Sequence, residues 1–126
     1  MLGMSEVFAS FSVDDIGAAK RFYGDTLGLD VAGGGDDRGP LWLQVAGQRS
    51  VLIYPKADHT PAAFTVLNVM VDDIERAVDD LVTRGVLIDT FDAYESDARG
   101  IHHAGGHSVA WFRDPAGNVV SVGQEH

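Results

Sequence analysis

The sequence predicts an α+β fold of two paired βαβββ modules whose mixed sheets form a cup. The first observation behind this prediction is an internal repeat, because Val-Asp-Asp-Ile occurs at 13–16 and again at 71–74, an offset of 58 residues. The second is that each copy follows an alternating apolar stretch, opens a helical pattern and precedes three strand-like segments. One such module would leave an apolar sheet face uncovered, whereas two paired modules bury more of it. The sequence leaves open whether the modules pair within one chain or between chains.

The first module is expected over residues 6–55. Its first strand covers 7–13, and Asp14 or Asp15 caps the helix that follows. Gly24 and Gly28 are expected to break this helix. A glycine-rich run at 33–39 is expected to be a flexible loop rather than a phosphate loop, because no Gly-Lys-Ser/Thr follows it. The remaining strands are expected at 29–32, 41–45 and 50–54, the last two forming a hairpin across 46–49.

Residues 56–63 are polar, contain a proline and are expected to link the modules. The second module is expected over 64–124 and begins with a strand at 64–71. Asp72 should cap the next helix, with Glu75 completing a capping box, and Gly85 should end it in the left-handed conformation. The helix should bury one apolar face, formed by Ile74, Ala77, Val78, Leu81 and Val82. A strand at 86–91, a long polar stretch at 92–106 and a hairpin of 107–113 and 118–123 complete the module.

Composition excludes several classes of function. The formal net charge is −10, and an acidic surface repels both nucleic-acid phosphates and anionic membranes. No apolar run approaches the roughly 20 residues of a membrane helix, and residues 1–6 lack the features of a signal peptide. The chain has no cysteine, which excludes disulfides and thiolate metal sites and fits a reducing compartment. We therefore expect a cytoplasmic protein with no nucleic-acid or membrane partner. Acidity would attract a cationic ligand, although it also serves solubility.

Three motifs occur in order along these modules. They are Val13-x-Asp15-Ile16, Phe22-Tyr23-x-x-x-Leu27-Gly28-Leu29 and Phe112-x-Asp114-Pro115-x-Gly117-Asn118. Together with the repeat, they resemble the vicinal oxygen chelate superfamily, which includes glyoxalase I, bleomycin-resistance proteins, extradiol dioxygenases and methylmalonyl-CoA epimerases. The resemblance covers about residues 6 to 124, is closest to small bacterial glyoxalase/bleomycin-resistance-like proteins, and implies the fold named after glyoxalase, bleomycin resistance protein and dihydroxybiphenyl dioxygenase. The motifs themselves form caps and a turn, so they specify the fold and carry no chemistry alone.

The resemblance also implies where a metal would sit. Enzymes of this superfamily usually hold one divalent metal in the cup, with His, Gln or Glu ligands on the first and last strands of each module, and the metal polarises neighbouring substrate oxygens. The corresponding positions here are Phe8, Leu52, Val66 and Ser121, and none is a good ligand for a hard cation. A shift of one residue brings in no better donor. We therefore expect neither the usual metal centre nor another cofactor.

A displaced metal site is the alternative. Three histidines cluster in the polar stretch of the second module, with two carboxylates upstream: the set is His102, His103, His107, Glu95 and Asp97. Such a site would support a lyase, isomerase or dioxygenase. The competing interpretation is a solvated loop near the mouth of the cup, because built metal sites place their ligands on rigid strands with supporting partners.

Strand alternation assigns a set of side chains to the cup. The set is mostly apolar with a few polar groups, as small-molecule sites are, and it comprises Phe8, Ser10, Trp42, Leu52, Tyr54, Val66, Asn68, Trp111 and Ser121. Any one of these side chains is equally compatible with filling the core.

Three functions are compatible with these features. The first is a metal-free small-molecule-binding protein that sequesters an apolar or aromatic compound between modules, as the bleomycin-resistance proteins imply. A homodimer is expected on the same ground. The second is the enzyme with the displaced metal site. The third is a dimerising scaffold that acts on a partner protein without binding a ligand.

Overall fold

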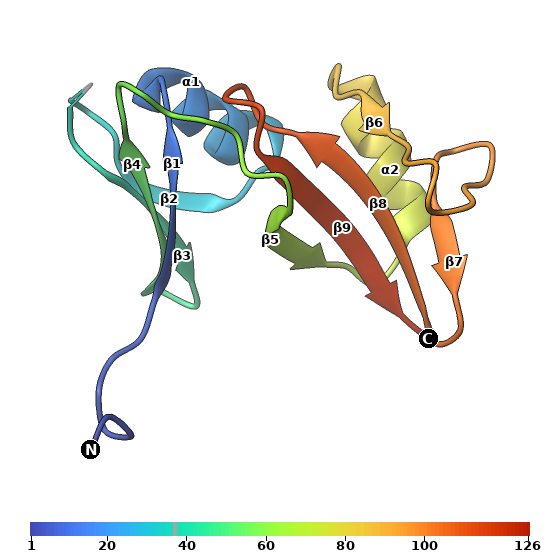
Figure 1. Cartoon of the computed structure of the whole chain (residues 1–126), viewed down its shortest axis with the longest axis horizontal. Helices are drawn as coiled ribbons and strands as arrows, with labels where there is room; N and C mark the ends of the chain where they lie inside the picture. Colours follow the sequence, from blue (N-terminus) through green and yellow to red (C-terminus); the bar gives the residue numbers. More distant parts are fainter. Residues whose placement is uncertain (37) are drawn as a thin grey trace. The chain divides into compact units, whose positions relative to one another are not determined.

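A computed structural model of the chain describes residues 1–36 and 38–126. These residues form two compact units, Met1–Thr60 and Pro61–His126. Each unit contains one mixed sheet and few helical residues, as Figure 1 shows, which confirms the predicted α+β class and the two modules. Within the described residues, no helix has the length and apolar character needed to cross a membrane.

The first unit has the predicted βαβββ order. Its elements are β1 (Ala9–Val13), α1 (Ile16–Lys20), η1 (Arg21–Thr26), β2 (Asp30–Gly33), β3 (Leu41–Val45) and β4 (Gln48–Pro55). The strands lie in the order β1-β4-β3-β2, with β1 parallel to β4 and the other pairs antiparallel. The module therefore closes by pairing its first strand with its last.

The helical segment of this unit is longer than predicted. Asp15 is the N-cap and accepts a 3.0 Å hydrogen bond from the Ala18 backbone N–H. The prediction that Gly24 breaks the helix is wrong, because the π-helical turn η1 runs through Gly24 to Thr26. A Cβ at this position would lie 3.0 Å from Cγ2 of Val31, so the glycine permits close packing of the helix on β2. The break comes at Gly28, whose φ is +73°.

The two faces of the first sheet differ. Phe11, Val13, Leu41 and Ile53 are buried on one face, and the ring of Phe11 lies 5.9 Å from that of buried Tyr23 in the helical segment. This face therefore forms the core with the helix. Alternation puts Ser10, Trp42, Leu52 and Tyr54 on the other face, which we call the helix-distal face.

The hairpin of β3 and β4 turns more tightly than expected. β4 begins at Gln48, so two residues, Ala46 and Gly47, connect the strands instead of four. Their φ angles are +53° and +77°, the signs that a type I′ turn requires. The predicted flexible loop at 33–39 contains Asp37, which lies outside the described residues. Its ends approach each other, because the Gly34 N–H donates a 3.2 Å hydrogen bond to the Pro40 carbonyl.

The second unit repeats this plan with an additional strand. Its elements are β5 (Thr65–Met70), α2 (Ile74–Thr83), β6 (Ile88–Asp89), β7 (His102–Ala104), β8 (His107–Arg113) and β9 (Val119–Glu125). The order is β5-β9-β8-β6, with β5 parallel to β9, and β7 also pairs with β8. Helix α2 lies against β8 and β9 (Figure 1). The strand predicted at 86–91 is reduced to β6, and β7 falls in the stretch predicted as a polar loop.

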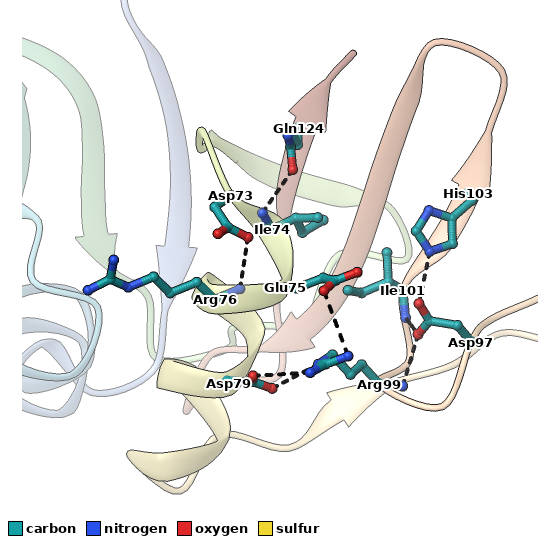
Figure 2. A network of polar contacts seen from close by, with 10 residues as sticks. All are labelled: Asp73, Ile74, Glu75, Arg76, Asp79, Asp97, Arg99, Ile101, His103 and Gln124. Atoms are coloured by element: carbon teal, nitrogen blue, oxygen red, sulfur yellow. Dashed lines mark hydrogen bonds and ion pairs between the residues drawn. The ribbon is translucent and has the colours of Figure 1, made fainter.

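Helix α2 begins one residue later than predicted. Asp73, not Asp72, is the N-cap, and its Oδ1 accepts a 3.2 Å hydrogen bond from the Arg76 backbone N–H (Figure 2). With this start, position N3 is Arg76, so the predicted capping box with Glu75 is wrong. The Ile74 backbone N–H is satisfied by Gln124 Oε1 of β9 at 3.0 Å. The helix start is therefore fixed by a contact from the far end of the module.

The end of α2 follows the prediction. Gly85 has φ +88°, its N–H donates to the Val82 carbonyl at 3.0 Å, and the Val86 N–H donates to the Leu81 carbonyl at 3.0 Å. This is the Schellman pattern. The predicted apolar face is confirmed at Ile74, Val78 and Leu81, but Val82 is 56% exposed. Val86, just beyond the helix, is buried at the position where a Schellman motif usually places an apolar residue.

The segment between β4 and β5 is anchored at both ends. The Lys56 N–H donates to the Val13 carbonyl at 2.9 Å in the first unit. The Ala62 N–H donates to Asn118 Oδ1 at 3.4 Å in the second unit. In the sequence, the boundary between the two units falls between Thr60 and Pro61.

Candidate functional site

In the first unit, five predicted site residues share the helix-distal face. Ser10 pairs with Leu52, and Leu52 pairs with Trp42, so the three form one row across β1, β4 and β3. Tyr54 lies two residues from Leu52 on β4 and therefore on the same face. The ring of Phe8 meets that of Trp42 edge-on, with centroids 4.9 Å apart. The Arg49 guanidinium also lies over this indole, 5.1 Å from its centroid.

In the second unit, three predicted residues form the matching row. Asn68 pairs with Ser121, and Ser121 pairs with Trp111, across β5, β9 and β8. The Ser121 hydroxyl donates a 2.6 Å hydrogen bond to Asn68 Oδ1 and is buried. The pairing of β5 shifts between Thr65 and Leu67, so Thr65 lies beside Val119 where an unbroken register would place Val66. The assignment of Val66 to the cup stays a prediction.

A pocket opens around Trp111 within the second unit. Its volume is about 630 Å³, inside the range of small-molecule sites. Four of its lining side chains are aromatic, and we call it the aromatic pocket. Its lining residues are Pro61, Ala62, Ala63, Phe64, Thr65, Phe91, Tyr94, Trp111, Arg113 and Val119. Trp111 is the one residue shared with the set predicted for the cup.

The indole of Trp111 is held by rings on several sides. Phe91 meets it edge-on with centroids 5.3 Å apart, and Tyr94 lies at 5.3 Å with the ring planes 32° apart. His102 stacks at 6.2 Å, and its Nδ1 is hydrogen bonded to the Glu95 carbonyl at 2.7 Å. Each such aromatic pair adds roughly 0.5–1.5 kcal/mol beyond the area it buries. The indole of Trp111 is thus packed against three neighbouring rings.

The charge of the pocket comes from Arg113. Among the described lining residues it is the one that carries a formal charge at neutral pH. Its Nε donates a 2.8 Å hydrogen bond to Asp89 Oδ2, and its Nη1 donates to the Gly117 carbonyl at 3.3 Å. The guanidinium is therefore fixed at one edge of an otherwise apolar site.

Sequence reasoning missed most of this pocket. Phe91 and Tyr94 lie in segments predicted as strand end and polar loop, and Phe64 precedes β5. A signal for them was available in the sequence, because Phe91 and Tyr94 are two aromatic residues close together in the segment that precedes β8, the strand of Trp111. Arg113 could have been found as well, since it lies two residues from Trp111 and shares its face.

The residues at the usual metal positions do not fit a metal. Phe8, Leu52 and Val66 offer no donor atom, and the Ser121 hydroxyl is hydrogen bonded to Asn68. Among the residues that the structure describes, no group of three or more His, Cys, Asp or Glu could hold a metal ion. No step of a reaction can therefore be derived through a metal in this chain.

The set predicted as a displaced site is not brought together. His102 and His103 are consecutive on β7 and point to opposite faces. His103 Nε2 lies 2.8 Å from Asp97 Oδ2 (Figure 2). Its Nδ1 lies 2.9 Å from the Ser108 hydroxyl. His107 is exposed at the start of β8, and Glu95 contributes its backbone carbonyl to His102.

Asp97 serves the loop instead. Its Oδ1 accepts hydrogen bonds from the backbone N–H groups of Arg99 at 2.9 Å and Ile101 at 3.0 Å (Figure 2). Burial raises the pKa of this carboxyl, but the hydrogen bonds from His103, Ile101 and Arg99 together lower it by more than burial raises it. The net pKa therefore lies below the ordinary value of 3.8. Arg99 then joins the loop to α2 through Asp79 at 3.0 Å. The loop carrying Tyr94 is thus fixed by this network.

The comparisons with known proteins agree with this architecture. TnmS3, an antibiotic binding protein from Streptomyces sp. CB03234, is 25% identical with a TM-score of 0.75, and all of both chains is covered. A glyoxalase/bleomycin resistance protein from the same organism is 26% identical with a TM-score of 0.62, over 95% of this chain and 100% of that one. Lactoylglutathione lyase from Agrobacterium tumefaciens, at 24% identity and a TM-score of 0.59, covers 95% of this chain and 93% of its own, and shows the fold alone.

No curated protein sequence matches the chain. The sequence model of the Glyoxalase/Bleomycin resistance protein/Dioxygenase superfamily matches residues 7–122. That match spans both modules and all three motifs that carried the resemblance. The chain therefore belongs to the glyoxalase/bleomycin resistance protein/dioxygenase superfamily.

Proposed function

We propose that the chain is a small-molecule-binding protein that holds an aromatic compound in the aromatic pocket and uses no metal to do so. The observation that carries this proposal is the pocket itself, about 630 Å³ in volume, with four aromatic side chains and one fixed cation. Apolar walls with a few placed polar groups are the usual make-up of small-molecule sites. The likeness to TnmS3, an antibiotic binding protein, supports the same class of function.

The metal-free part of the proposal rests on the side chains at the four usual positions, three of which are apolar. Enzymes of this superfamily usually place a Lewis acid beside the substrate oxygens, and the aromatic pocket presents a guanidinium instead. We also propose, from the superfamily resemblance, that the protein forms a homodimer, and, from its lack of cysteine, that it acts in the cytoplasm.

A thermal-shift screen with planar aromatic compounds of one to three rings tests this function. Binding to the native state raises the unfolding temperature with ligand concentration. We expect several compounds to do so, with no change when a chelator is present. The Tyr94→Ala variant should lose most of the shift, whereas Tyr54→Ala should keep it; both tyrosines are partly exposed, at 49% and 36%, and only Tyr94 lines the pocket.

Two outcomes would count against the proposal. If chelation abolishes the shift, a metal takes part in binding. If Tyr54→Ala removes the shift and Tyr94→Ala does not, the ligand binds on the first unit and the aromatic pocket is not the site.

A further inference from the structure

We propose that the aromatic pocket selects aromatic compounds that carry an oxygen acceptor at one edge, a carboxylate first and a neutral carbonyl second, and that Arg113 is the residue that selects them. This inference rests on the proposed function and adds the chemical class of the ligand.

Arg113 and Trp111 present their side chains to the same space. They lie two residues apart on β8, so they project from the same face of the sheet, and both line the pocket. Arg113 pairs with Val119, which lines the pocket as well. A ring stacked near the indole would therefore have one edge turned toward the guanidinium.

The guanidinium is held in place but keeps free donors. A guanidinium has five N–H groups in one plane. One is bound by Asp89 Oδ2 at 2.8 Å and one by the Gly117 carbonyl at 3.3 Å, so three are left without a partner among the described residues. Asp89 pairs with Trp111 by register, so the carboxylate that binds the guanidinium comes from the position opposite Trp111 in the sheet. A planar, fixed donor suits in-plane acceptor oxygens of a flat ligand.

The local hydrogen-bond donors favour an acceptor over a cationic ligand. Arg113 is the one formal charge among the described lining residues, and Asp89, which offsets that charge through a 2.8 Å ion pair, does not line the pocket. The chain carries a net charge of −10, which by itself would attract cations. At physiological ionic strength, however, exposed charges are screened beyond about 8 Å. The directional hydrogen bonds of Arg113 should then affect the ligand preference of the pocket more than the distant acidic surface does.

The test is isothermal titration with three matched probes at physiological salt: 2-naphthoate, 2-naphthamide and 2-naphthylmethylammonium. They share one ring system and differ in the group at its edge. We expect the carboxylate to bind about tenfold more tightly than the ammonium, with the amide between them, because a charge-assisted hydrogen bond at a half-exposed site is worth about that factor.

Two variants assign the selection to Arg113. Arg113→Met should bring the three affinities to within about twofold of one another, because stacking remains while the donors are lost. Arg76→Met removes the same charge from the same unit at an exposed helix position outside the pocket, so it should leave the tenfold preference intact.

The outcomes separate the inference from the function beneath it. If no probe binds, the proposed function itself fails. If the probes bind equally, or the ammonium binds most tightly, the pocket binds aromatic compounds but Arg113 does not select them. The order of the three probes on the unaltered protein is decisive even if Arg113→Met does not fold.

Discussion

Ser121 occupies a position where the superfamily resemblance implies a metal ligand, yet its hydroxyl donates to Asn68 at 2.6 Å. Its cross-strand neighbour is Trp111, which lines the aromatic pocket. A hydroxyl that is already hydrogen bonded, with a large ring beside it, favours an aromatic ligand over a metal in the function that we propose. The side chain at a given position of the sheet therefore says more about function than the fold does.

The N-cap of α2 gives a residue-scale prediction. Asp73→Ala should lower the free energy of unfolding by about 1 kcal/mol, because the Arg76 N–H loses its acceptor. Asp72→Ala is the matched control and should change it by less than about 0.5 kcal/mol. Urea unfolding followed by circular dichroism measures both. Equal effects at the two positions would show that the helix begins elsewhere.

Asp97 gives a pH-dependent prediction. Its carboxyl has a pKa below 3.8 in the folded chain, so folding favours the ionised form. The resulting stability is fully present above 3.8 and is lost as the pH falls through the lower folded value. The wild-type protein should therefore exceed Asp97→Asn in stability at neutral pH, and the difference should shrink in acid. A difference that stays constant across a series of urea titrations down to the acid limb would contradict this account.

At the scale of elements, the sequence predicted what local patterns specify. The apolar face of α2 and its stop at Gly85 follow from helical spacing and from one left-handed glycine. The strand β7 was missed because His102–Ala104 has no apolar alternation, and only its pairing with β8 makes it a strand. The sequence favoured Asp72 for the cap because Glu75 lies three residues later. Gln124, some 50 residues away, supports the start that the structure adopts by binding the Ile74 N–H.

Two glycines with the same backbone conformation allow the cost of backbone strain to be measured apart from the cost of steric crowding. Gly85 and Gly100 have φ of +88° and +87°, but a Cβ at Gly85 meets nothing within 4 Å, whereas one at Gly100 would lie 2.7 Å from Ile88 Cγ2. Gly85→Ala should cost about 1 kcal/mol for the left-handed conformation alone. Gly100→Ala should cost about 2–3 kcal/mol, because Ile88 must also move. Denaturant midpoints compare them, and equal costs would mean that the loop yields without strain.

At the scale of the whole molecule, the two units share one plan. Each closes by a parallel pairing of its first and last strands, β1 with β4 and β5 with β9. The repeat of Val-Asp-Asp-Ile predicted this duplication, because each copy lies where the first strand meets the helix. The site was less predictable. Strand alternation identified Trp111, but the loop that brings Tyr94 against it is shaped by hydrogen bonds of Asp97 that no local pattern reveals.

In the function that we propose, the ring of Trp111 is the binding surface for an aromatic ligand. The chain has two tryptophans, so Trp42→Phe leaves Trp111 as the one fluorescent indole and Trp111→Phe leaves Trp42. Titration of both variants with a planar aromatic compound that raises the unfolding temperature is the most direct test. We predict saturable quenching of the Trp111 emission and a loss of binding in Trp111→Phe. Quenching of Trp42 with full affinity in Trp111→Phe would contradict the account and place the ligand on the first unit.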